Sequence, residues 1–186
     1  MSASPAAPRR RIRETEVVAA AATFLATQGY RVYPNPDAAD YFDLAARRGN
    51  EVGLVEAKVA GTRKVLVQAL KRRAWGDWVA VVVPSELAAH RLVRRTDTTR
   101  AAPVGVWVAR EGVVRVLRPA RAWVRPGEDD PYSDLRARFR TLLDRIDSGE
   151  IPTDVPWGGV VGAVRRASGG RGFAEWRLDE PVERDR

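Results

Sequence analysis

Residues 40–59 read DYFDLAARRGNEVGLVEAKV, and this stretch predicts a β-hairpin. Asp40–Arg47 and Glu51–Val59 are rich in apolar residues and are expected to be strands. Gly49-Asn50 lies between them and is typical of the two-residue turn that joins antiparallel strands. The rest of the chain is arranged around this hairpin.

The turn also predicts which residues of the two strands face each other. A two-residue loop pairs Arg48 with Glu51. The same register sets Asp43 directly opposite Glu56, with Cβ atoms about 5 Å apart. Lys58 lies two residues beyond Glu56, so its side chain points to the same face of the sheet. The sequence therefore predicts two carboxylates and one amine side by side.

Two facing carboxylates repel each other, and a divalent cation between them would remove that conflict. Mg²⁺ prefers oxygen ligands and usually takes one or two protein carboxylates together with waters and substrate phosphates. A bound metal activates a coordinated water and polarises a phosphoryl oxygen, while Lys58 would stabilise charge at the phosphorus. These groups are the minimum equipment for hydrolysing a phosphodiester, with Mg²⁺, or Mn²⁺ in its place, as cofactor.

A surface hairpin with an ion-pair cluster is the structural alternative for these residues. A Glu-Ala-Lys tripeptide alone is a weak signal. The apolar neighbours favour the metal site, because charged residues inside apolar strands call for a reason; these neighbours are Leu54, Val55, Ala57 and Val59.

Composition narrows the chemistry further. The 186 residues include no Cys and one His, so thiolate metal sites, Cys nucleophiles and multi-His zinc sites are excluded. No apolar run approaches the roughly 18–20 residues of a membrane span, and residues 1–13 lack the apolar stretch of a signal peptide. A cytoplasmic protein with no membrane association is expected.

Helical and strand patterns extend on both sides of the hairpin. The expected elements are a helix over Ile12–Gln28, a strand over Tyr30–Tyr33, a helix over Arg63–Arg73, a strand over Trp78–Val83, a helix over Ser85–Leu92, and a second hairpin formed by Val104–Ala109 and Val113–Leu117. The core order is helix, three strands, helix, strand. This order predicts an α/β fold with a central mixed sheet flanked by helices.

The chain divides into three expected parts. Residues 1–11 are rich in Ala, Pro and Arg and predict a disordered basic arm. Residues 12–125 contain the predicted domain, and residues 126–186 form an acidic C-terminal appendage with a Gly-rich tail. An amphipathic helix over Pro131–Ser148 in this appendage is a candidate interface.

Positive charge is concentrated in the middle of the chain. The net charge is +8, and residues 61–125 alone carry +10. On the helix predicted there, one stripe holds Lys64, Gln68, Lys71 and Arg72. We expect the three cationic side chains of this stripe to contact nucleic-acid phosphates. A solvated face in an Arg-rich protein is the alternative.

The hairpin and the element order resemble the PD-(D/E)XK nuclease superfamily, which includes restriction endonucleases and archaeal-type Holliday junction resolvases. The resemblance covers roughly Arg13 to Val83. Asp43 matches the acidic residue of the second strand, and Glu56-Ala57-Lys58 matches the Glu-x-Lys motif. A literal Pro-Asp occurs at Pro36-Asp37, but it falls outside the hairpin pairing, so Asp43 is preferred.

The resemblance implies a restriction endonuclease-like core and a Mg²⁺-dependent DNA endonuclease. It implies that Asp43, Glu56 and the carbonyl of Ala57 bind the metal, and that Lys58 is catalytic. It also implies catalytic roles for a Gln on the following helix and a Glu on the first helix. Gln68 matches the former; Glu16 or Glu14 matches the latter, and the sequence does not separate them.

Such an enzyme would act on duplex or branched DNA in repair, recombination or defence against mobile elements. A homodimer is compatible with this role, because cutting both strands with one small site calls for two copies. The alternatives are a non-catalytic nucleic-acid-binding module that keeps the fold, and an interaction protein in which the charge cluster is incidental.

Overall fold

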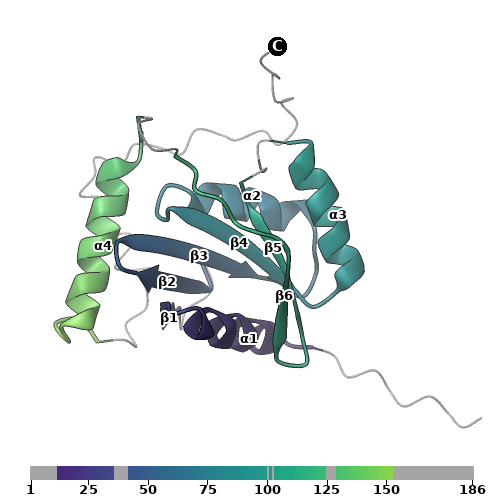
Figure 1. Ribbon diagram of the computed structural model, residues 1–186, viewed down its shortest axis with the longest axis horizontal. Helices are drawn as coiled ribbons and strands as arrows, with labels where there is room; N and C mark the ends of the chain where they lie inside the picture. The colour runs from purple at the N-terminus through teal and green to yellow at the C-terminus, as the bar shows by residue number, and fades with distance from the viewer. Residues whose placement is uncertain (1–11, 36–41, 100, 102, 125–128, 153–186) are drawn as a thin grey trace, which may run out of the picture.

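A six-stranded mixed β-sheet forms the centre of the molecule in a computed structural model (Figure 1). The structure describes residues 12–35, 42–99, 101, 103–124 and 129–152. The strands lie in the order in which they occur along the chain. The two strand pairs around β4 are parallel, and the other three pairs are antiparallel.

Four helices accompany the sheet. In chain order the elements are α1 (Glu14–Thr27), β1 (Arg31–Pro34), β2 (Leu44–Arg48), β3 (Glu51–Ala57), α2 (Arg63–Arg72), β4 (Trp78–Val83), α3 (Glu86–Asp97), β5 (Gly105–Arg110), β6 (Val113–Arg118) and α4 (Ser133–Asp147). The expected order of helix, three strands, helix and strand is confirmed. None of the helices in the described ranges is long and apolar enough to cross a membrane.

The hairpin between β2 and β3 has the predicted register. Arg48 pairs with Glu51 and Leu44 pairs with Val55. Asp43 lies just before β2, and its N–H donates to the Val55 carbonyl. The strand is shorter than expected, because β2 begins at Leu44 rather than at residue 40.

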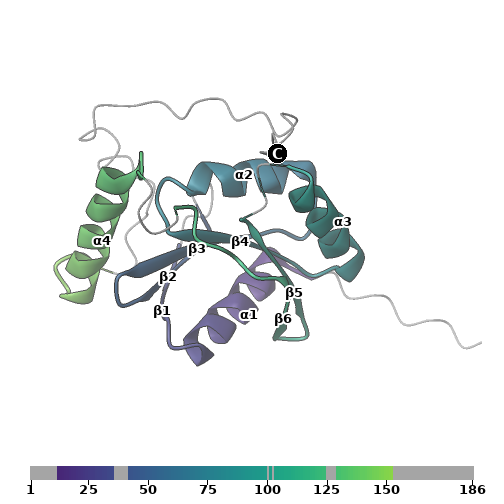
Figure 2. The same cartoon turned by 45° about the horizontal axis from the view of Figure 1, so that its top comes forward.

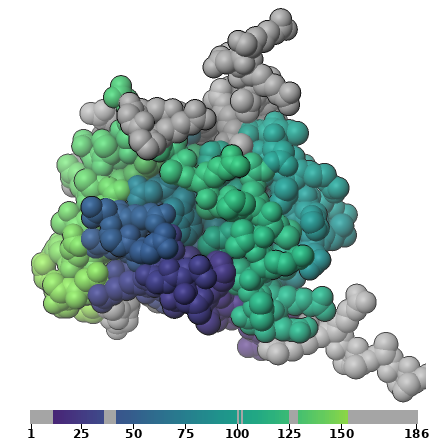
Figure 3. Space-filling model, in the orientation of Figure 1, coloured from purple at the N-terminus to yellow at the C-terminus, as the bar shows by residue number. Residues whose placement is uncertain are grey.

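Helices cover both faces of the sheet (Figure 2). The helix α1 packs on one face, where Leu25 contacts the apolar cluster that includes Val82 and Trp107. The other face is covered by α2, α3 and α4, whose apolar residues share a second cluster with β3, β4 and β5. Figure 3 shows α3 and α4 at opposite edges of the molecule.

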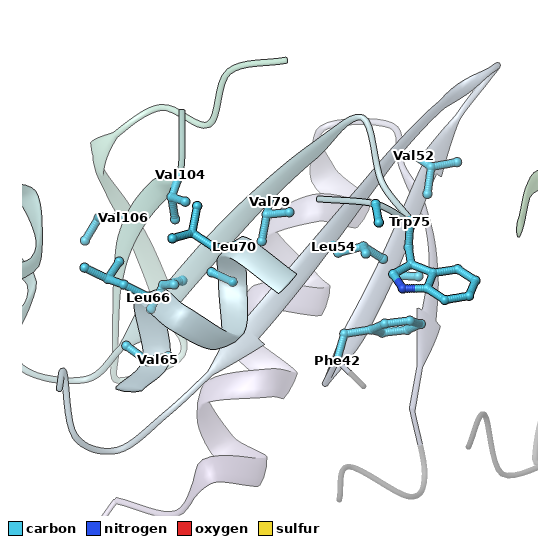
Figure 4. Packing of buried hydrophobic residues seen from close by; sticks show 14 of the residues in the cluster. Phe42, Val52, Leu54, Val65, Leu66, Leu70, Trp75, Val79, Val104 and Val106 are labelled. Atoms are coloured by element: carbon cyan, nitrogen blue, oxygen red, sulfur yellow. The ribbon is translucent and has the colours of Figure 1, made fainter. Parts of the chain in front are cut away.

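The larger cluster is closed at the α4 edge by aromatic rings. Phe42 and Trp75 lie next to each other in Figure 4. The Phe139 ring of α4 is 5.7 Å from the Phe42 ring and 6.2 Å from the Trp75 ring, between centroids and in edge-to-face contact. All three side chains are at most 2 % exposed, so α4 completes the same core as the central strands.

This position corrects the expected role of residues 131–148 as an appendage with an interface helix. The apolar face of α4 is buried inside the domain, where Leu142, Leu143 and Ile146 join Phe139. Its ion pairs also lie within the chain, since Arg140 Nη2 is 2.6 Å from Asp77 Oδ1. The apolar face of α4 is therefore covered within the domain.

The helix after β4, α3, extends beyond Leu92, where it was expected to end. It begins after Ser85, whose Oγ accepts a hydrogen bond from the Ala88 N–H at 3.3 Å, as expected of an N-cap. It continues to Asp97 because buried positions recur with helical spacing as far as Thr96.

Candidate functional site

Asp43 and Glu56 lie side by side at the end of the β2–β3 hairpin. The register that pairs Leu44 with Val55 brings them together, and they are 2 % and 3 % exposed. Burial of two carboxyl groups is unusual, because moving a charge out of water is unfavourable unless a partner compensates for it. The pair therefore needs a nearby cation.

Lys58 supplies a positive charge between the acidic side chains. Its Nζ is 2.8 Å from Glu14 Oε1, 3.5 Å from Glu56 Oε1 and 3.6 Å from Asp43 Oδ2. We refer to Glu14, Asp43 and Glu56 as the acidic cluster. It is assembled from α1, the start of β2 and the end of β3.

Backbone contacts hold Asp43 in place. Its Oδ2 accepts a hydrogen bond from the Ala57 N–H at 2.6 Å, and its backbone carbonyl accepts one from the Asn35 N–H at 3.0 Å. The Asp43 N–H donates to the Val55 carbonyl. The Asp43 carboxylate is therefore fixed beside Ala57, the residue whose carbonyl is the third expected metal ligand.

Glu56 is less completely satisfied than Asp43. Its Oε2 is buried and makes no hydrogen bond among the described residues, although Arg72 Nε lies 3.7 Å away. Burial, and then the charge of Asp43, raise the pKa of Glu56 to about 7, against the opposing charges of Arg72 and Lys58. A cation beside this oxygen would stabilise the ionised carboxylate.

Burial and nearby charges also act in opposite directions on the pKa values of Asp43 and Lys58. Burial raises the pKa of Asp43, although the Ala57 hydrogen bond and the charge of Lys58 oppose the shift. Burial would lower the pKa of the Lys58 ammonium, but the Glu14 hydrogen bond and the surrounding carboxylates raise it overall. The Lys58 ammonium therefore stays protonated.

Three carboxylates face two cationic side chains at this site, so the fully ionised set has a formal charge of −1. The donor atoms are carboxylate oxygens, which are the ligands that Mg²⁺ prefers. Among the described residues, no group of three or more His, Cys, Asp or Glu side chains is placed to hold a metal ion. The residues present fit an ion bound by two carboxylates that completes its shell with water and substrate.

The structure brings Glu14, and not Glu16, to Lys58. The two positions are about 200° apart around the helix axis, so only one can face the cluster. Glu16 instead lines a separate cavity beside Glu111 and Gly112 of the β5–β6 turn. The sequence left this choice open because the phase of α1 depends on how it packs on the sheet.

The residues predicted on α2 separate into two groups. Lys64 and Lys71 are exposed, and Gln68 is half-buried one turn before Arg72. Arg72 was expected to contact DNA phosphates, but its side chain is only 13 % exposed and its guanidinium lies against Glu56. Arg72 thus belongs to the site, and its i,i+4 spacing from Gln68 was the signal in the sequence.

Two further predictions concern Pro36-Asp37 and Ala57. The alternative Pro36-Asp37 falls outside the described residues. Ala57, whose carbonyl is a predicted metal ligand, is fully buried and donates its N–H to Asp43.

Comparisons with known proteins support the fold of this chain and say nothing about its activity. No family model matches the chain, and no curated protein matches it. A solved structure of SPO1766, a protein of unknown function from Silicibacter pomeroyi, is similar to this chain with a TM-score of 0.50 at 16 % identity. The similarity covers 89 % of this chain and 99 % of that one. At this identity the likeness concerns the α/β fold alone.

Proposed function

We propose that the protein is a Mg²⁺-dependent DNA endonuclease with a restriction endonuclease-like core. The observation that carries the proposal is the buried pair Asp43 and Glu56 with Lys58 within 3.6 Å of both. A binding module has no need of two buried carboxylates that face each other, and their burial destabilises the fold unless a ligand compensates for it.

Each residue of the site has a definable task in phosphodiester hydrolysis. Asp43 and Glu56, with the Ala57 carbonyl, would hold the divalent ion, which lowers the pKa of a coordinated water and polarises a phosphoryl oxygen. Glu14 holds the Lys58 ammonium at 2.8 Å, so that its charge can stabilise the negative charge that develops on the phosphate. Arg72 balances the charge of Glu56 from the other side.

The substrate follows from charge. The net charge of +8 and the +10 carried by residues 61–125 favour a polyanion, and exposed Lys64 and Lys71 lie on the helix that follows the site. A nuclease that acts on duplex or branched DNA, alone or as a homodimer, would use the positive charge of residues 61–125 and the exposed lysines of α2 to bind its substrate.

The test is a cleavage assay on supercoiled plasmid and branched DNA with Mg²⁺, with Mn²⁺ or with chelator. We expect cutting with either metal, none with chelator, and a loss of at least about a hundredfold in Glu56→Ala and in Lys58→Ala. Asp134→Asn, at an exposed carboxylate in the first turn of α4, is the control and should cut normally.

A different outcome would favour the second candidate. Salt-sensitive DNA binding without cutting, under every metal condition, would overturn the nuclease and leave a nucleic-acid-binding module with the same fold.

A further inference from the structure

We propose that a groove on α3 binds the sugar–phosphate backbone of the DNA, a few nucleotides from the cut phosphate. The groove is lined by α3 and the start of α2, has a volume of about 440 Å³, and includes Arg91, Arg94, Arg95, Thr98 and Gly61. We call it the arginine groove. The identity of the polyanion as DNA rests on the proposed function, whereas the groove itself rests on the observations below.

Three of the four arginines that line the groove form one face of α3, and the fourth, Arg63, is the first residue of α2. Positions 91, 94, 95 and 98 have the spacing of a single helical stripe. The opposite face holds Ala89, Leu92 and Thr96, which are buried in the core. The apolar face therefore fixes the helix, and the arginines are held outwards along a surface that lies at one edge of the molecule (Figure 3).

In the described part of the chain, the three arginines of α3 have no carboxylate partner, unlike most of the other arginines there. Ten other arginines of the described residues lie within 4.0 Å of a carboxylate. Among the same residues, no carboxylate lies within that distance of Arg91, Arg94 or Arg95. An Arg-rich composition alone would distribute unpaired charges over the surface and would not gather three in one concave site.

The acidic residues of α3 are neutralised by other partners. Glu86 is 2.7 Å from Arg115, and Asp97 pairs with Arg118, both on β6. The carboxylates of α3 therefore pair with β6, whereas its arginines at positions 91, 94 and 95 line the groove. An anion that enters the groove meets no carboxylate of α3 that is not already paired.

One residue of the arginine groove, Gly61, lies on the loop that follows Lys58 and packs tightly on α3. A Cβ on Gly61 would lie 2.8 Å from the Ala88 Cβ and 3.2 Å from Leu92, so the loop after β3 presses directly on α3. Gly61 is three residues beyond Lys58, which limits their Cα separation to about 11 Å. Phosphates of one strand advance by about 3.4 Å per nucleotide along a duplex, so the groove is within a few nucleotides of the site.

Arginine is well suited to this task. Its planar guanidinium donates paired hydrogen bonds to two oxygens of a phosphate and remains charged at every physiological pH. Contacts of this kind position DNA without reading its sequence. The proposal therefore predicts backbone binding that responds to salt and not to base sequence.

The test compares single substitutions that each remove one positive charge. Binding of a fluorescent duplex is measured by anisotropy in chelator, between about 50 and 200 mM salt. Arg91→Ala and Arg94→Ala should each weaken binding about fivefold to tenfold near 0.1 M salt, and should reduce the slope of log affinity against log salt by about 0.9. Arg138→Ala removes an exposed arginine from α4, at the opposite edge, and should change affinity by less than about twofold.

Several results would overturn the proposal. They are an equal effect of all three substitutions, no salt-dependent binding by the wild-type protein, or release of the duplex by inorganic phosphate at constant ionic strength, which would indicate a small-anion site. Because chelator prevents cutting, failure of the nuclease leaves this result unchanged. Conversely, metal-dependent cutting with normal binding by Arg91→Ala and Arg94→Ala would reject the groove and keep the nuclease.

Discussion

At the scale of single residues, Glu56 is the side chain whose environment departs most from that of a free carboxyl group. That Asp43 lies near it could be expected from the turn at Gly49-Asn50, because pairing in a two-residue hairpin is determined by counting and the observed register runs as far as Leu44 and Val55. The choice between Glu14 and Glu16 could not be made in this way. It depends on the rotation of α1 against the sheet, which local sequence does not encode.

The raised pKa of Glu56 predicts how stability changes with pH in the absence of metal. Because its pKa is about 7 in the folded chain against 4.5 ordinarily, the folded state binds the proton more tightly. The stabilisation is complete below about pH 4.5 and is lost as pH rises through about 7, a loss of about 3 kcal/mol. Glu56→Gln cannot ionise, so its free energy of unfolding should fall by about 3 kcal/mol less over this range.

Urea unfolding of both proteins in chelator, at several pH values, measures this difference. Asp134→Asn should follow the wild-type pH dependence, since its carboxylate is exposed. Parallel curves for wild type and Glu56→Gln would show that burial does not perturb Glu56.

At the scale of elements, the hairpin and the order of strands were predictable, whereas the packing of two helices was not. The run of alanines in α1 leaves its apolar face ambiguous in the sequence. The buried face includes Val17 and Ala20, whereas Val18 is only half-buried. The pattern of α4 indicated which of its residues are buried. It could not indicate that they meet Phe42 and Trp75 rather than a second chain.

The position of α4 makes a quantitative prediction about stability. Phe139 is fully buried between Phe42 and Trp75, so Phe139→Ala should lower the free energy of unfolding by about 3–5 kcal/mol. Arg138→Ala, one residue earlier and exposed, should change it by about 0.5 kcal/mol or less. Equilibrium urea unfolding measures both, and equal effects would mean that α4 does not belong to the core.

At the scale of the whole molecule, the buried carboxylates and the exposed arginines lie in separate places. A nuclease would use the carboxylates to bind a metal ion and the arginines to bind DNA. Carboxylates are buried at the carboxyl end of β3, and unpaired arginines line the neighbouring groove on α3. The net charge of +8 indicated a polyanion without a location. The location depends on which arginines form ion pairs, and this is determined by tertiary contacts between segments far apart in the sequence.

The central claim is that Asp43 and Glu56 hold a divalent cation, and Mn²⁺ binding followed by electron paramagnetic resonance tests it most directly. At about pH 8 the wild-type chain should bind one Mn²⁺ at the site, and at about pH 6 its affinity should fall about tenfold, since a carboxyl with a pKa near 7 is then mostly protonated. Glu56→Gln should lose this ion at both pH values, and Asp134→Asn should keep it. Equal Mn²⁺ binding by all three proteins, or no binding by the wild type, would contradict the account.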